Sequence, residues 1–202
     1  MRILLFDNQD SFTWNLAHEL ERVSVDLEVV VKTAYELPAI EDLPGYINGF
    51  EAVILSPGPG MPADATMLME VLDIAIKSSM PVLGICLGLQ AIVEHFGGEL
   101  VNLEKVLHGR TSEMVWSKEG EPSGVFKNIQ FPCVVGHYHS WVASEEGFPE
   151  GVLQIETRNQ QGLIMAISHR SLPVSGFQFH PESILTPDGR AMLASWLELI
   201  SA

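Results

Sequence analysis

Short apolar runs alternate with a helical pattern along the first part of the chain. Residues 3–6, 27–31 and 52–55 have the length and composition of buried strands, and residues 13–22 have the apolar spacing of a helix. Strands separated by helices are typical of β-α-β units, in which the strands join a parallel sheet. We therefore predict a parallel sheet for this part of the chain.

The alternation continues toward the middle of the sequence. Asp64 is a suitable N-cap for a helix whose pattern runs to Lys77, and residues 81–85 then read as another buried strand. Residues 87–96 follow as a helix. Gly97 and Gly98 end it, because glycine readily adopts the left-handed conformation found at helix ends.

The second half has shorter strand-like runs, at residues 112–116, 133–135, 151–156, 163–168 and 174–179, which favour antiparallel pairing. A final amphipathic helix is expected from Arg190 to cover one face of the sheet, and residues 119–123 read as an exposed loop. These patterns predict one α/β domain over residues 1–202. Its central sheet is largely parallel, with helices on both faces and some antiparallel strands in the second half.

Composition supports a packed soluble domain and disfavours two kinds of partner. The 202 residues are 47% hydrophobic and 18% charged, which is sufficient for a core. The net charge of −15 would repel nucleic acid phosphates and anionic membrane surfaces. We therefore expect neither nucleic-acid binding nor membrane binding.

The cysteine content and apolar segments indicate a cytoplasmic protein. Two cysteines, Cys86 and Cys133, are too few for a secreted disulfide framework. The first apolar run is far shorter than that of a signal peptide. The longest uncharged stretch, residues 78–93, contains a proline and glycines and falls short of the ~20 apolar residues of a membrane span.

Cys86 lies in a Gly-x-Cys-x-Gly segment between a predicted strand and a predicted helix. Glycines at positions 84 and 88 allow the strand and helix to approach closely, while the central residue projects from a strained turn. The helix N-terminus favours anionic sulfur, and its amides can receive an oxyanion. A cysteine in an apolar strand is more often inert core, but this setting favours a nucleophile; Cys133 has no such setting and is expected in the core.

A thiol nucleophile needs a proton acceptor, for which His180 is the best candidate. His180 follows a predicted strand in the sequence His180-Pro181-Glu182, so Glu182 can orient its ring. Cys86 and His180 would both lie at the carboxyl edge of the sheet. Taken singly, a structural histidine and an exposed carboxylate remain alternatives. His137 and His139 could mimic a metal pair, but further ligands at recognisable spacing are missing, so no metal site is expected.

Three further features suggest a substrate pocket. The loop Ser56-Pro57-Gly58-Pro59-Gly60 permits close backbone approach to a ligand, or is simply a tight connection. Gln90 lies one helical turn after Cys86, although that signal alone is weak. Residues 138–141 read as a polar and aromatic loop, with a strand edge as the alternative.

These motifs resemble the class I glutamine amidotransferases, which have a flavodoxin-like fold, and most closely the glutaminase subunits of anthranilate synthase and aminodeoxychorismate synthase. The likeness covers nearly the whole chain. It is carried by residues 7–16, 56–60, 83–92, 108–109, 138–140 and 178–184. Two positions depart from the common pattern: Leu89 stands where many relatives have histidine, and Trp141 where leucine is common.

The resemblance implies a triad of Cys86, His180 and Glu182 that hydrolyses glutamine through a cysteinyl thioester. Ammonia would pass to a chorismate-binding synthase subunit, component I of anthranilate synthase or of aminodeoxychorismate synthase. No cofactor is implied for this subunit, and Mg²⁺ is expected on the synthase. The implied glutamine contacts are Gly58, Pro59, Gly60, Leu87, Gln90, Ser140 and Trp141.

The sequence leaves five possible functions. An anthranilate-forming partner in tryptophan biosynthesis is favoured over a folate-pathway partner or a subunit shared by both. A non-catalytic regulatory subunit would keep the fold without turnover. A γ-glutamyl peptidase would act on longer substrates without a partner.

Overall fold

A computed structural model describes residues 1–117 and 124–201. Within these ranges, nine strands form one sheet in the order β2-β1-β3-β4-β9-β8-β7-β5-β6. The strands are β1 (Arg2–Asp7), β2 (Glu28–Thr33), β3 (Ala52–Leu55), β4 (Val82–Ile85), β5 (Leu100–Trp116), β6 (Cys133–Ala143), β7 (Leu153–Asn159), β8 (Ile164–His169) and β9 (Val174–Phe177).

The sheet is parallel from β2 to β9 and antiparallel from β9 to β6. The longer helices are α1 (Thr13–Val23), α2 (Leu43–Ile47), α3 (Leu68–Lys77), α4 (Leu87–His95) and α5 (Gly189–Ile200). The short 3-10 turns are η1 (Ala34–Glu36), η2 (Pro62–Asp64) and η3 (Gly124–Phe126). The predicted α/β class, with a parallel first half and antiparallel strands later, is confirmed.

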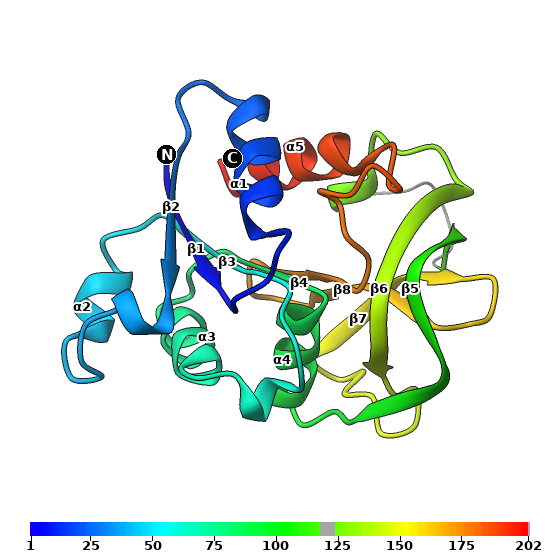
Figure 1. Cartoon of the computed structure of the whole chain (residues 1–202), viewed down its shortest axis with the longest axis horizontal. Coiled ribbons are helices and arrows are strands. Elements are labelled where there is room, and N and C mark those ends of the chain that lie inside the picture. Colours follow the sequence, from blue (N-terminus) through cyan, green and yellow to red (C-terminus); the bar gives the residue numbers. More distant parts are fainter. Residues whose placement is uncertain (118–123, 202) are drawn as a thin grey trace.

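Helices cover both faces of the parallel strands, as Figure 1 shows with α1 and α5 above the sheet and α2, α3 and α4 below it. The alternation of side chains along β1 explains the two layers. Ile3 and Leu5 belong to the apolar cluster under α1 and α5, whereas Leu4 and Phe6 belong to the cluster with α3 and α4. Because β1 is buried on both faces, its sequence is a near-continuous apolar run.

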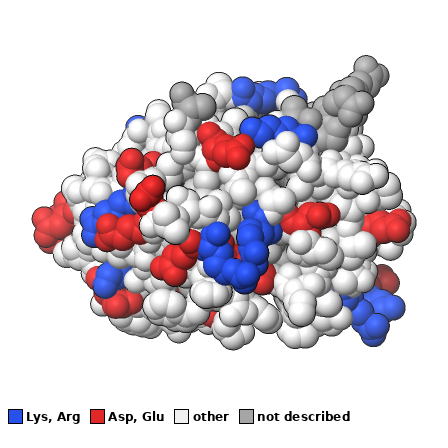
Figure 2. Space-filling model, turned by 90° about the horizontal axis from the view of Figure 1, so that it is seen from above, with Lys and Arg blue, Asp and Glu red and all other residues white. Residues whose placement is uncertain are grey.

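The face above α1 and α5 carries acidic and basic side chains next to one another (Figure 2). Glu19 of α1 accepts two hydrogen bonds from Arg190 of α5, at 2.6 and 3.2 Å, and one from Arg22 at 3.2 Å. The pair with Arg190 joins the two helices at their exposed edges, whereas the pair with Arg22 lies within α1. Although the net charge of the chain is −15, this face is therefore not purely acidic.

Two strands are much longer than predicted. β5 begins at Leu100 and β6 extends to Ala143, so residues 138–141 lie in a strand, which was the alternative, and not in a loop. Only residues 112–116 of β5 were predicted, because most of the strand is exposed, and its pairing with β6 is interrupted by two register shifts. Its strand conformation comes from cross-strand pairing, which a local apolar pattern does not reveal.

The capping role predicted for Asp64 was also wrong. Asp64 ends η2, and α3 begins at Leu68 after Met67, which takes a left-handed conformation with φ of 63°. The loop predicted at residues 119–123 lies outside the described residues. Among the residues that are described, no helix is long and apolar enough to cross a membrane.

Candidate active site

Cys86 and His180 follow neighbouring parallel strands. Cys86 comes directly after β4, and His180 comes three residues after β9, whose Phe177 pairs with Ile85. The amide of Cys86 donates a 2.7 Å hydrogen bond to the Phe177 carbonyl. Carboxyl ends of adjacent parallel strands meet at one edge, so the sheet brings together two residues that are far apart in the sequence.

Cys86 occupies the strained turn that its flanking glycines predicted. It takes φ of 51° and ψ of −98° and immediately precedes α4. A Cβ on Gly84 would lie 2.4 Å from the carbonyl carbon of Gly88, and one on Gly88 would lie 2.5 Å from the Leu55 carbonyl oxygen. At Gly84 and Gly88, β4, α4 and β3 are thus packed too closely for any side chain. This packing holds Cys86 in its unfavourable conformation.

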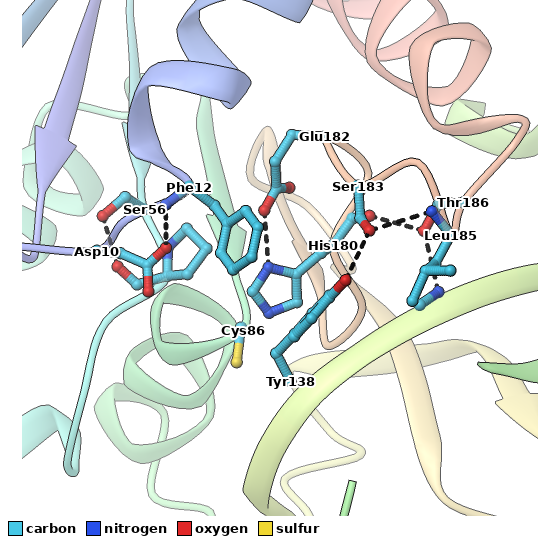
Figure 3. Close-up of polar contacts among 12 residues, drawn as sticks. Asp10, Phe12, Ser56, Cys86, Tyr138, His180, Glu182, Ser183, Leu185 and Thr186 are labelled. Atoms are coloured by element: carbon cyan, nitrogen blue, oxygen red, sulfur yellow. Dashed lines mark hydrogen bonds and ion pairs between the residues drawn. The ribbon is translucent and has the colours of Figure 1, made fainter. Parts of the chain in front are cut away.

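His180 is held by Glu182 through a 2.7 Å hydrogen bond between Nδ1 and the carboxylate, and both side chains are buried. Figure 3 shows the second ring nitrogen on the side of Cys86. Burial lowers the pKa of His180, but interactions with Cys86 and Glu182 outweigh it and raise the pKa. The site therefore favours the imidazolium form, which can protonate a leaving amine.

Two aromatic side chains confine the His180 ring. Phe12 and Tyr138 lie against it at centroid distances of 5.9 and 5.0 Å, and against each other at 4.9 Å (Figure 3). Both contacts with His180 are edge-to-face. The rings restrict the imidazole to the orientation that its bond with Glu182 requires.

The segment after His180 is fastened to β6 by side-chain hydrogen bonds. Thr186 Oγ1 donates to the His180 carbonyl at 2.7 Å and accepts from the Gly136 amide at 3.0 Å. The Ser183 hydroxyl lies 3.2 Å from the Tyr138 hydroxyl and accepts from the Leu185 amide. The backbone around His180 and Glu182 is thereby fixed to the strand that carries Tyr138.

The N-terminal loop fixes both Phe12 and the glycine loop. Asp10 accepts a 2.8 Å hydrogen bond from the Phe12 amide. Asn8 donates its amide to Ser56 Oγ and its side-chain nitrogen to the Ser56 carbonyl, each at 2.9 Å. A Cβ on Gly58 would lie 2.6 Å from both Asn8 and Leu87, so only glycine fits between these two segments.

A cavity of about 180 Å³ opens beside Cys86. Nearly all of the predicted substrate contacts line it; its lining residues are Gly58, Pro59, Gly60, Cys86, Gln90, Tyr138, His139, Ser140 and Trp141. Leu87 is the exception, since its side chain is buried against Gly58. A larger cavity of about 440 Å³ lies beside α5 and the β8–β9 connection, but it does not include Cys86 or His180.

The alternative of a metal site at His137 and His139 gains no support from their contacts. His139 Nε2 lies 3.2 Å from His137 Nδ1, and the other nitrogen of His137 lies 2.7 Å from the Ser112 hydroxyl. Burial lowers the pKa of His137 to about 4 and that of His139 to about 3, so both rings are neutral. Among the described residues, no group of three or more His, Cys, Asp or Glu side chains is arranged to hold a metal ion.

Cys133 lies in the core, as expected. It is a buried free thiol in the cluster under α1 and α5. Burial, with a smaller contribution from Asp188, raises its pKa to about 12. Cys133 is therefore a thiol at neutral pH and does not compete with Cys86 as a nucleophile.

Comparison with known proteins places this geometry in a family. The model of the class-I glutamine amidotransferases matches residues 4–199. The chain belongs to this family. Anthranilate synthase component 2 of Mycobacterium tuberculosis is 38% identical to this chain, over 98% of this chain and 82% of its own length.

Two further relatives agree with this placement, and one solved structure shares the fold. The aminodeoxychorismate/anthranilate synthase component 2 of Bacillus subtilis is 36% identical over 97% of this chain and 95% of its own. A bifunctional relative from Thermotoga maritima is 36% identical over 98% of the chain, which spans only 32% of that longer protein. A GMP synthase subunit from Thermoplasma acidophilum shares the fold, with a TM-score of 0.82 at 20% identity over 100% of this chain and 94% of its own.

The two departures from the common amidotransferase pattern differ in location. Leu89 of α4 is fully buried and packs against Gly176 of β9, where an added Cβ would lie 3.1 Å from Leu89 Cβ. This position therefore contributes to the packing of α4 on β9. Trp141 lines the cavity, and its carbonyl accepts a 2.8 Å hydrogen bond from Gln90 Nε2. That contact uses the backbone and is independent of the side chain at position 141.

Sequence reasoning missed the individual roles of four positions in this site. Phe12 and Tyr138 were recognised only within motifs, and Thr186 was not recognised. Their roles depend on contacts between segments that are distant in sequence, so local spacing carried no signal for them. Gln178, also only part of a motif, lies close to Cys86.

Proposed function

We propose that this chain is a glutaminase subunit that releases ammonia from glutamine for a chorismate-using synthase, with anthranilate synthase as the favoured assembly. The observation that carries the proposal is the strained Cys86 beside the buried His180–Glu182 pair, in a chain of the class-I amidotransferase family. A thiol, a base and an orienting carboxylate are the groups needed for acyl transfer from an amide.

In the proposed mechanism, His180 holds the proton of Cys86 as an imidazolium, and the Cys86 thiolate attacks the side-chain amide carbon of glutamine. The oxyanion is received by amides at the start of α4 or in the Ser56–Gly60 loop. His180 then protonates the amide nitrogen, the carbon–nitrogen bond breaks and ammonia leaves a γ-glutamyl thioester. Water gives a proton to His180 and attacks the thioester, which releases glutamate and restores the Cys86 thiolate beside the His180 imidazolium.

Gln90 is suited to recognise a donor group on the substrate. Its Nε2 donates to the Trp141 carbonyl at 2.8 Å and to Gln178 Oε1 at 3.4 Å, so its own oxygen remains the acceptor available to a ligand. An α-ammonium group is such a donor. Ser140, Trp141 and the Gly58–Gly60 backbone line the remainder of the cavity.

The choice of partner rests on the relatives. The M. tuberculosis relative is named as a component of anthranilate synthase, whereas the B. subtilis relative is named for both aminodeoxychorismate and anthranilate synthases. We therefore propose a heteromeric complex with component I of anthranilate synthase, in the cytoplasm. Component I of aminodeoxychorismate synthase is the alternative. The proposal requires no cofactor on the glutaminase chain and assigns Mg²⁺ to the synthase.

The test is to combine the purified chain with each component I and supply glutamine, chorismate and Mg²⁺. Formation of anthranilate with release of one glutamate per product supports the favoured assignment. Formation of aminodeoxychorismate alone would assign the chain to the folate pathway. Absence of glutamate release with either partner contradicts the glutaminase proposal and favours a regulatory subunit.

A further inference from the structure

Gln178 lies next to the proposed nucleophile, and a backbone hydrogen bond fixes its position. It follows β9 directly, its side chain is fully buried, and its amide donates a 2.8 Å hydrogen bond to the Met165 carbonyl. The preceding residue, Phe177, accepts the hydrogen bond of the Cys86 amide. The end of β9 therefore presents Gln178 beside Cys86.

The side chain of Gln178 joins the nucleophile to the cavity. Its Nε2 donates to Cys86 Sγ at 3.5 Å, and its Oε1 accepts from Gln90 Nε2 at 3.4 Å. Gln90 Nε2 also donates to the Trp141 carbonyl at 2.8 Å. The contacts form a chain from the β6 backbone through two side-chain amides to the sulfur.

This chain determines which way each amide is turned. The Trp141 carbonyl can only accept, so Gln90 must present its nitrogen on that side. The same nitrogen lies beside Gln178, which must therefore present its oxygen. The nitrogen of Gln178 then faces the sulfur, and Cys86 has a fixed donor rather than an acceptor at this contact.

We propose that Gln178 is a positioning residue for Cys86, whose amide holds the sulfur in place, favours its anionic form and links it to Gln90. A donor stabilises thiolate more than thiol, because hydrogen bonds to charged acceptors are stronger. Burial of Gln178 shields this contact from water and strengthens it. The catalytic consequence depends on the proposed glutaminase function, whereas the effect on the sulfur does not.

The test compares Gln178→Met and Gln178→Glu with the unmodified chain. Methionine has similar length and no donor, and glutamate has the same shape but a negative charge near the sulfur. Gln154→Met is the matched control, since Gln154 on β7 accepts only an exposed hydrogen bond from Arg170. The rate at which iodoacetamide alkylates Cys86 is measured against pH, with the label located by mass spectrometry.

The midpoint of the alkylation profile is expected to rise by about one pH unit in Gln178→Met, from the loss of a hydrogen bond to a charged group. A larger rise is expected in Gln178→Glu, and none in the control. A folded Gln178→Met chain with the unmodified profile overturns the proposal. Should that variant fail to fold, an unchanged profile in the isosteric Gln178→Glu overturns it equally.

Turnover separates this inference from the proposed function. In the complex with component I, Gln178→Met is expected to lower kcat for glutamine by about tenfold, equivalent to a barrier increase of about 1.4 kcal/mol, with a smaller change in KM. If the unmodified complex releases no glutamate, the glutaminase proposal fails. The alkylation profiles still decide the role of Gln178 in that case.

Discussion

At the residue scale, the proposed nucleophile is held in a strained conformation by the close packing of its neighbours. Cys86 has a positive φ, and the glycines two residues before and after it have no space for a Cβ. The cost of such a conformation is about 1–3 kcal/mol and must be offset by surrounding contacts. The stability of the turn and the reactivity of the thiol are therefore linked.

Gly88→Ala tests this link. The added Cβ would meet the Leu55 carbonyl oxygen at 2.5 Å, so β3 and α4 must separate. We expect a loss of about 1–3 kcal/mol in the free energy of unfolding, measured by urea denaturation, together with loss of glutaminase activity.

Gly45→Ala is the matched control for Gly88→Ala. Gly45 lies in α2, where a Cβ would have no atom within 4 Å. Alanine is expected to leave activity unchanged and to stabilise the helix by up to about 1 kcal/mol. Equal stability losses in the two variants would contradict the packing explanation.

Glu182→Gln tests how the carboxylate acts on His180. Glu182 helps to raise the pKa of His180, so its loss is expected to lower that pKa. The imidazolium would then deprotonate at lower pH, and the alkaline limb of the kcat/KM profile should move to lower pH. The activity at neutral pH is expected to fall by about 100-fold.

Steady-state kinetics in the complex between pH 6 and 10 would measure this change. Glu28→Gln, at an exposed ion pair with Arg2, serves as the control. An alkaline limb that stays at the original pH in Glu182→Gln would contradict the assigned role.

At the scale of elements, the segment 180–186 and β6 act as one support for the histidine. Thr186 is buried and bridges the His180 carbonyl and the Gly136 amide. This support was invisible in the sequence because β6 was recognised only at residues 133–135. Polar residues such as His137 and His139 break the apolar alternation by which a strand is recognised. The strand conformation of β6 depends on its pairing with β5.

Thr186→Val should weaken this support. Valine has nearly the same shape but leaves the buried Gly136 amide without its acceptor, at a cost of about 1–3 kcal/mol in unfolding free energy. Because the His180 backbone loses an anchor, kcat should fall while KM for glutamine changes less. Thermal denaturation and steady-state kinetics provide the two readouts.

The same substitution at Thr111, on the exposed side of β5, is the control and should change neither quantity. A Thr186→Val chain with unchanged kcat would show that the loop keeps His180 in place without this bridge.

At the scale of the whole molecule, the parallel sheet assembles the site from distant segments. The first-half strands and the Cys86 elbow were predictable because buried parallel strands and paired glycines are local signals. The pairing of His180 with Glu182 was predictable from their two-residue spacing. The aromatic contacts of Phe12 and Tyr138 were not predictable, since they depend on how the N-terminal loop and β6 meet in space.

The central claim is that Cys86 takes ammonia from glutamine for a synthase partner. The most direct measurement is product formation by the Cys86→Ser chain in complex with component I, supplied first with glutamine and then with ammonium. We expect glutamine-dependent synthesis to be lost while ammonium-dependent synthesis stays at the level of the unmodified complex. Glutamine-dependent synthesis that persists in Cys86→Ser would contradict the account.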